Sequence, residues 1–158
     1  NKITQKENLL YINFQINTND KVRSELYRHF EKKSWVKIES PNLELKDYLK
    51  SLSSSDFVLC PFGNGYDTHR LWESLYAGAI PIVEKHPTFQ ETTSDLPVIR
   101  EVLNEKNSIL VESDNIELWV NSIKKLQNLK IRELIANQAF IDFYDYSWRN
   151  RAKVVVKI

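Results

Sequence analysis

The sequence predicts an α/β domain with a Rossmann-like, doubly wound parallel sheet. Short continuous apolar runs alternate with stretches whose apolar residues recur at helical spacing, and such runs are typical of parallel strands that helices cover on both faces. All three glycines of the chain, Gly63, Gly65 and Gly78, fall in the segment 56–84. That segment is predicted to form a strand, a loop, a helix and a second strand joined by a parallel crossover.

The composition is that of one domain and narrows the range of partners. The chain has 158 residues and a formal net charge of +1, so it is long enough to bury a core. Its lysines are interspersed with acidic residues, which argues against nucleic-acid binding, and no run approaches the roughly 18 apolar residues of a membrane span. The single cysteine, Cys60, lies in an apolar run and is predicted to be a buried side chain.

The first half of the chain supplies two predicted strands and two predicted helices. The apolar run 9–14 predicts a buried strand, and residues 17–20 predict a loop and an N-cap before a helix over 21–32. The β-rich segment 35–38 predicts a second strand. Apolar residues spaced by four and three then predict a helix over 45–52.

The glycine-bearing segment is predicted to be the working part of the molecule. A buried strand over 56–61 leads into a tight loop over 62–67, a helix that begins near Thr68 and ends at Gly78, and a buried strand over 80–83. Glycine in such a loop permits a positive φ and a close approach of a ligand to the main chain. The following helix directs its unpaired N–H groups and positive dipole end at the same place, so an anion site is predicted there.

The remainder of the chain continues the alternation of strands and helices. Two more strands are predicted over 95–100 and 108–111, and two helices after Asn115, the second of them long and ending near Arg151. Ligands of a parallel sheet bind at the carboxyl ends of its strands, and the loop over 62–67 lies at such an end.

Two segments of the chain resemble a known family. The run CPFGNGYDTHRLWESLYAGAIPIV, residues 60–83, resembles the donor-binding segment of GT-B glycosyltransferases, particularly the exostosin-like and related sugar transferases. The shared pattern is a proline, a glycine-containing loop, a His-Arg pair, an aromatic residue, a glutamate and a small-residue, proline and hydrophobic strand. The ending YDYSWRNRAKVV, residues 144–155, resembles the final helix of such domains, and together the two segments cover about a quarter of the chain.

The resemblance implies the carboxy-terminal half of a GT-B fold and a site for a nucleotide sugar. It implies one nucleotide-sugar-binding domain over 1–158, part of a larger two-domain enzyme, whose other domain would bring a glycan, protein or lipid acceptor. The start at an asparagine and the lack of methionine fit a fragment. The catalytic base of such enzymes usually lies in the acceptor domain, so no catalytic residue is assigned.

The residues themselves offer groups for each part of a nucleotide sugar. Main-chain N–H groups of Gly63, Asn64 and Gly65 are expected to face the diphosphate, and Asp67 or Thr68 is expected to cap the helix.

Three side chains of the predicted helix add charge to the same place. His69 and Arg70 lie in its first turn, where a basic residue opposes the helix dipole unless an anion is near. Glu73 shares their face, and its carboxylate can accept both hydroxyls of a ribose.

Each of these residues has a plainer alternative. Arg70 and Glu73 fit an ordinary ion pair of the i,i+3 type, and His69 fits a solvated histidine. Asp67 suits a helix cap better than a catalytic acid. Trp72 is expected to pack in the core, with a base-stacking wall as the alternative.

Residues at two other strand ends are weaker candidates. Asn13, Asn17 and Thr18 follow the first strand and project toward the same edge of the sheet, although a polar turn accounts for them equally well. Glu84, with Lys85 and His86 after it, is expected to belong to a solvated loop, and contact of Glu84 or His86 with the transferred sugar is the alternative. No spacing of His, Asp, Glu or Cys predicts a protein-bound metal or another cofactor, and no GxSxG motif predicts a hydrolase.

A second class of function is left open. A non-catalytic α/β domain of flavodoxin-like or receiver shape would serve as an interaction or regulatory module. A receiver needs an acidic cluster after its first strand and an aspartate after its third, where this chain has Asn13 and Pro61. That version of the alternative is therefore disfavoured.

Overall fold

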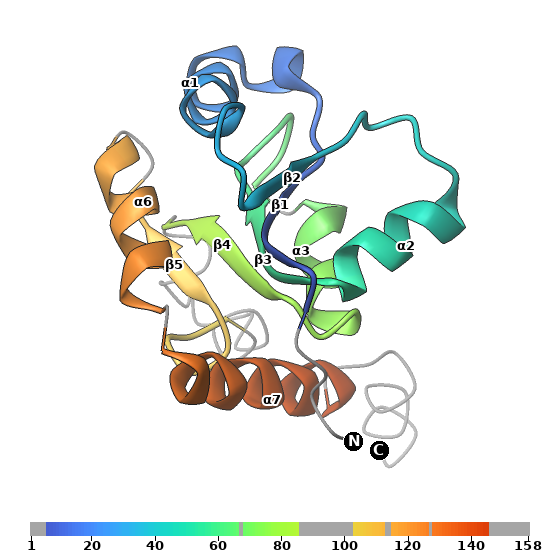
Figure 1. Ribbon diagram of the computed structural model, residues 1–158, viewed down its shortest axis with the longest axis vertical. Helices are drawn as coiled ribbons and strands as arrows, with labels where there is room; N and C mark the ends of the chain where they lie inside the picture. The colour runs from blue at the N-terminus through green and yellow to red at the C-terminus, as the bar shows by residue number, and fades with distance from the viewer. Residues whose placement is uncertain (1–5, 67, 86–102, 113–114, 127, 146–158) are drawn as a thin grey trace, which may run out of the picture.

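The computed structural model describes residues 6–66, 68–85, 103–112, 115–126 and 128–145. Five of its strands form one sheet, and every pair of neighbours is parallel, in the order β2-β1-β3-β4-β5 (Figure 1). The strands are β1 (Asn8–Ile12), β2 (Val36–Ile38), β3 (Ser55–Cys60), β4 (Ile80–Glu84) and β5 (Ile109–Val111). The predicted parallel α/β sheet is confirmed, while the strand predicted over 95–100 lies outside the described residues.

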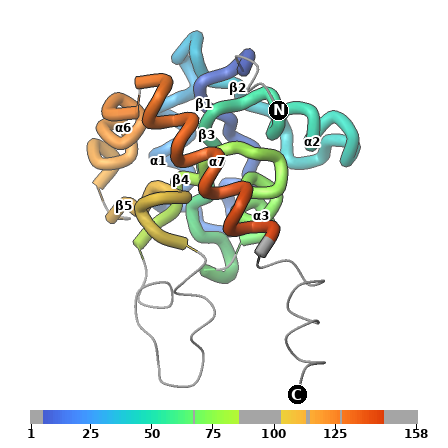
Figure 2. The backbone as a smooth tube through the Cα atoms, turned by 90° about the horizontal axis from the view of Figure 1, so that it is seen from below, coloured from blue at the N-terminus to red at the C-terminus, as the bar shows by residue number. Residues whose placement is uncertain are grey.

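Helices cover both faces of this sheet, as a doubly wound fold requires. They are α1 (Asp20–Phe30), α2 (Leu45–Ser53), α3 (His69–Tyr76), α6 (Ile116–Lys125) and α7 (Leu129–Asp145), with the short 3-10 helix η1 (Ile16–Thr18) before α1. Helices α1 and α6 pack on one face, α2 and α3 pack on the other, and α7 contributes residues to the hydrophobic clusters of both (Figures 1 and 2). In the described parts of the chain, no helix combines the length and apolar character needed to cross a membrane.

The continuous apolar runs are explained by burial on both faces of the strands. In β3, Phe57 and Leu59 face the α1 and α6 layer, whereas Val58 and Cys60 face the α2 and α3 layer, and all four are fully buried. Burial raises the pKa of the Cys60 thiol to about 12, so it stays protonated. The prediction that Cys60 is a buried apolar side chain is confirmed.

The predicted stop of the glycine-bearing helix is also confirmed. Gly78 has a φ of 70°, the left-handed region that a helix-ending glycine adopts easily. Its N–H donates to the Leu75 carbonyl at 3.1 Å, and the Ala79 N–H donates to the Ser74 carbonyl at 2.9 Å. The end predicted for the last helix, near Arg151, lies outside the described residues.

The strand order creates a switch point between β1 and β3. After β1 the chain moves to β2 on one side, and it then returns across β1 to form β3 on the other side. The loops that leave the carboxyl ends of β1 and β3 therefore diverge, and a crevice opens between them.

Candidate functional site

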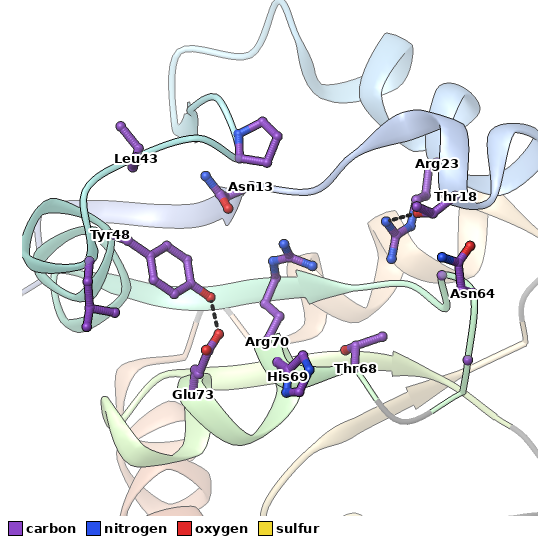
Figure 3. Close-up of a pocket in the computed structure, with 14 residues that line it drawn as sticks. Asn13, Thr18, Arg23, Leu43, Tyr48, Asn64, Thr68, His69, Arg70 and Glu73 are labelled. Carbon is purple, nitrogen blue, oxygen red and sulfur yellow. Dashed lines mark hydrogen bonds between the residues drawn. The ribbon is translucent and has the colours of Figure 1, made fainter.

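A cleft of about 570 Å³ lies at this switch point (Figure 3). Seven of the eight residues that the sequence singled out line it: Gly63, Asn64, Gly65, Thr68, His69, Arg70 and Glu73. The eighth, Asp67, lies outside the described residues. The other lining residues come from the end of β1, from α1 and from the segment that leads into α2: Asn13, Thr18, Arg23, Pro41, Leu43, Leu45 and Tyr48.

The loop after β3 is held by hydrogen bonds from both sides. The guanidinium of Arg23 donates to the carbonyls of Pro61 and Phe62, each at 2.9 Å, and the Asn19 amide donates to the Phe62 carbonyl at 3.2 Å. From the opposite side, the Phe62 N–H donates to the Glu84 carboxylate at 2.9 Å. The loop is thus preorganised by groups from α1 and β4.

Glu84 corrects an expectation from the sequence. It was expected in a solvated loop, but it is the last residue of β4 and only 2% exposed. A buried carboxylate needs hydrogen-bond donors, and the Phe62 N–H supplies one. Lys85 is exposed and pairs with Glu112 at 3.4 Å, in agreement with the solvated expectation, and His86 lies outside the described residues.

The role of the loop glycines also differs from the expectation. Neither Gly63 nor Gly65 has a positive φ, and the Gly63 N–H, expected to face a ligand, donates to the Gly65 carbonyl at 3.2 Å. Gly63 is instead required by space, because a Cβ there would lie 2.8 Å from the Arg23 Nη2 atom. A Cβ at Gly65 would meet nothing within 4 Å.

Arg23 is the main site residue that the sequence reasoning missed. It lies on α1 and is 5% exposed, with its guanidinium directed at the cleft (Figure 3). A signal was present, because Arg23 stands three residues before Leu26 and seven before Phe30, at the spacing of the buried face of the helix. Burial and the nearby charge of Arg70 lower the pKa of Arg23 to about 10, so it is charged at neutral pH.

Arg70 is half-buried and points into the same cleft (Figure 3). Its buried Nε atom has no hydrogen-bond partner among the described residues. The alternative of an Arg70–Glu73 ion pair is not what forms, because no salt bridge joins these two described side chains. Two guanidinium groups therefore share one cleft, and one of them lacks a partner in the described part of the chain.

Glu73 is hydrogen-bonded to a residue that the sequence reasoning did not consider. The Tyr48 hydroxyl, on α2, donates to the Glu73 Oε2 atom at 2.6 Å (Figure 3). Burial, and then this hydrogen bond, raise the pKa of Tyr48 well above its ordinary value. No sequence signal links the two, because their positions are 25 residues apart.

The remaining candidates divide between the cleft and its surroundings. Asn13 lines the cleft, and its amide donates to the Ser40 carbonyl at 2.7 Å, which ties the end of β1 to the loop after β2. Thr18 also lines the cleft, whereas Asn17 lies in a neighbouring hollow. His69 is exposed at the rim, and Trp72 packs against the core rather than lining the cleft.

The far end of the cleft is apolar. Pro41, Leu43 and Leu45 line it, in the segment that leads from β2 into α2. The described residues contain no group of three His, Cys, Asp or Glu side chains that could hold a metal ion. The site therefore consists of a cationic end, a carboxylate and an apolar end.

Comparison with known families shows to which family the chain belongs. Residues 4–144 match the family described as RXYLT1 C-terminal domain. The chain belongs to the RXYLT1 C-terminal domain family. No curated protein matches the chain.

Two solved structures of low sequence identity resemble the fold of the chain. It is similar to the C-terminal domain of a glycosyl transferase group 1 family protein, LpcC, from Francisella tularensis, with a TM-score of 0.55, 12% identity, and coverage of 92% of this chain and 88% of that one. It is also similar to TarM, with a TM-score of 0.56, 11% identity, and coverage of 99% of this chain and 37% of that one. The predicted GT-B carboxy-terminal, glycosyltransferase-like fold is thereby confirmed.

Proposed function

We propose that this chain is the donor-binding domain of a glycosyltransferase and that its cleft binds the diphosphate of a nucleotide sugar. The observation that carries this proposal is the position of Arg70 and Arg23 in one cleft. Two like charges there repel, and a buried N–H without a partner costs about 1–3 kcal/mol. A diphosphate would relieve both penalties, because its oxygens accept charge-assisted hydrogen bonds.

The order of groups along the cleft supports the same ligand. The cations Arg23 and Arg70 suit the diphosphate, the Glu73 carboxylate suits the ribose diol, and the apolar wall that includes Leu43 suits the base. The cleft lies at the carboxyl ends of β1 and β3, where ligands of doubly wound folds bind.

This arrangement assigns a chemical role to the two arginines. When a sugar leaves its nucleotide, the bond between the anomeric carbon and the phosphate oxygen breaks, and the bonding electrons remain on the diphosphate. Fixed positive charge beside that oxygen stabilises the transition state more than the ground state. Arg70 and Arg23 supply such charge, so we propose that donor binding does not require a metal held by the protein.

A panel of ligands tests the proposal. Binding of a ligand raises the free energy of unfolding by RT ln(1 + [L]/Kd), which is about 2.7 kcal/mol at a ligand concentration of 100 Kd. This stabilisation is observed as a higher melting temperature. We expect UDP or GDP and the matching nucleotide sugar to stabilise the chain and FMN to have no effect. A response to FMN alone, or to none of the diphosphates, would exclude a donor site.

Transfer of the sugar is proposed to need a second domain. The acceptor, whether glycan, protein or lipid, and the catalytic base would meet the donor from outside this domain, and their proximity accounts for much of the rate. We therefore expect residues 1–158 alone to bind donor without transferring sugar. Rapid turnover by this chain alone would show that it carries its own catalytic groups.

A further inference from the structure

Tyr48 and Glu73 join two helices that line the cleft. Tyr48 lies on α2 and Glu73 on α3, and the Tyr48 hydroxyl donates to the Glu73 Oε2 atom at 2.6 Å (Figure 3). Both residues line the cleft. The hydrogen bond therefore fixes one oxygen of a carboxylate at the ligand site.

The second oxygen of Glu73 is left for a ligand. Within the described part of the chain, Oε1 accepts no hydrogen bond, and Arg70 forms no ion pair with Glu73. A free glutamate samples many rotamers, and fixing one of them costs conformational entropy. Tyr48 fixes the rotamer before the ligand arrives, so less of that cost falls on binding.

Tyr48 packs against a residue of the sheet. Its ring lies 6.3 Å from the ring of Tyr11, centroid to centroid, and Tyr11 is fully buried on β1. Because burial raises the pKa of the Tyr48 phenol, the hydroxyl stays protonated and acts as a donor at every physiological pH. The position of Glu73 is thus set by the core of the sheet.

We propose that Tyr48 is a positioning residue that orients Glu73 to accept the ribose hydroxyls of the donor. This inference rests on the proposed function, because it assumes a ribonucleotide in the cleft. It goes further by assigning the discrimination of ribose from deoxyribose to a pair of side chains. Tyr48 acts through Glu73 and needs no contact with the ligand.

The test compares ribonucleotides with nucleotides that lack the diol. Calorimetry would measure the affinity of the 158-residue chain for UDP and GDP and for the 2′,3′-dideoxy forms of both. We expect Tyr48→Phe to weaken binding of the preferred ribonucleotide about three- to ten-fold, less than the loss of a direct hydrogen bond to a charged group, because Tyr48 acts only through Glu73. Affinity for its dideoxy form should not change.

Two further variants separate this effect from a loss of structure. Tyr76→Phe makes the same chemical change on an exposed residue of α3 outside the cleft, and it should alter neither affinity. Glu73→Gln should weaken ribonucleotide binding while sparing the dideoxy form. The double variant Tyr48→Phe with Glu73→Gln should bind no more weakly than Glu73→Gln alone, because both changes remove one interaction.

The outcomes distinguish this inference from the proposed function. If the wild-type chain binds neither UDP nor GDP, the proposed function fails and the role of Tyr48 fails with it. If Glu73→Gln reduces the preference for ribose but Tyr48→Phe leaves it unchanged, the donor site stands and the role of Tyr48 is overturned. Equal losses for the ribo and dideoxy forms in Tyr48→Phe would also overturn it, since they would indicate a general structural effect.

Discussion

Charged side chains are buried at the amino ends and at the carboxyl ends of the strands, called here the amino edge and the carboxyl edge of the sheet. The two edges differ in how these charges are paired. At the amino edge, Asp56 forms a salt bridge with Arg132, and the Lys6 ammonium donates to the carbonyls of Ser55 and Gly78 at 3.0 and 2.5 Å. At the carboxyl edge, Arg23 donates only to neutral oxygens among the described residues, and neither Arg23 nor Arg70 forms a salt bridge there. The buried Nε atoms of Arg70 and of Arg132 both lack a hydrogen-bond partner in the described part of the chain, so the two edges differ in charge pairing.

The difference teaches that burial of a charge does not by itself mark a functional site. Asp56 and Arg132 carry opposite charges that neutralise each other, so their burial needs no ligand. Arg23 and Arg70 are like charges in one cleft and neither forms a salt bridge among the described residues, so an anionic ligand would stabilise both. We therefore assign the amino edge to stability and propose the carboxyl edge for binding.

The largest expected effect comes from removal of the salt bridge at the amino edge. Arg132→Met would leave the half-buried Asp56 carboxylate without its main partner, so we expect a loss of about 3 kcal/mol in the free energy of unfolding. Nucleotide affinity should not change. Urea unfolding and calorimetry would measure the two quantities, with the exposed Lys130→Met on the same helix as the control. A loss of affinity without a loss of stability would reverse the assignment of the two edges.

Arg70→Ala should produce the opposite pattern at the carboxyl edge. We expect affinity for the nucleoside diphosphate to fall by about 2–3 kcal/mol, because a charge-assisted hydrogen bond to the diphosphate is lost. Affinity for the nucleoside should change little, and added salt should weaken the variant less than the wild type. Arg28→Ala, on the exposed side of α1, is the control. Equal losses for the diphosphate and the nucleoside would assign Arg70 to structure.

Glu73→Gln should have a smaller effect, because it replaces a charged acceptor with a neutral one and keeps the shape of the side chain. We expect the affinity for the nucleotide to fall by about 1–2 kcal/mol, with an unchanged circular dichroism spectrum. Glu25→Gln, on the exposed face of α1, should leave affinity unaltered. Wild-type affinity in the Glu73 variant would remove this carboxylate from the site.

The smallest expected effect is that of chelation. If Arg23 and Arg70 neutralise the diphosphate, EDTA should leave the calorimetric affinity for UDP or GDP within about two-fold of its original value, a difference below 0.5 kcal/mol. A larger loss that Mg²⁺ or Mn²⁺ restores would show that a divalent cation contributes to donor binding.

The sequence predicted the structure best in segments whose fold is determined by residues close together in the chain. The apolar runs, the glycine stop at Gly78 and the polar first turn of α3 located the sheet, the helix and one wall of the cleft. The opposite wall of the cleft, which includes Tyr48 and Leu43, could not be predicted. These residues come close to α3 only because of the order of the strands in the sheet. Arg23 was within reach of prediction, since it occupies a core-facing position of its helix.

Because Gly63 fits closely against Arg23, we expect the two positions to change together in evolution. Any side chain at 63 would displace a guanidinium that two main-chain carbonyls hold in place. A homologue that loses this glycine is therefore expected to have lost the arginine as well, with a shorter residue on α1. Such a paired replacement would distinguish members of the family that have both arginines in the cleft from members that lack Arg23.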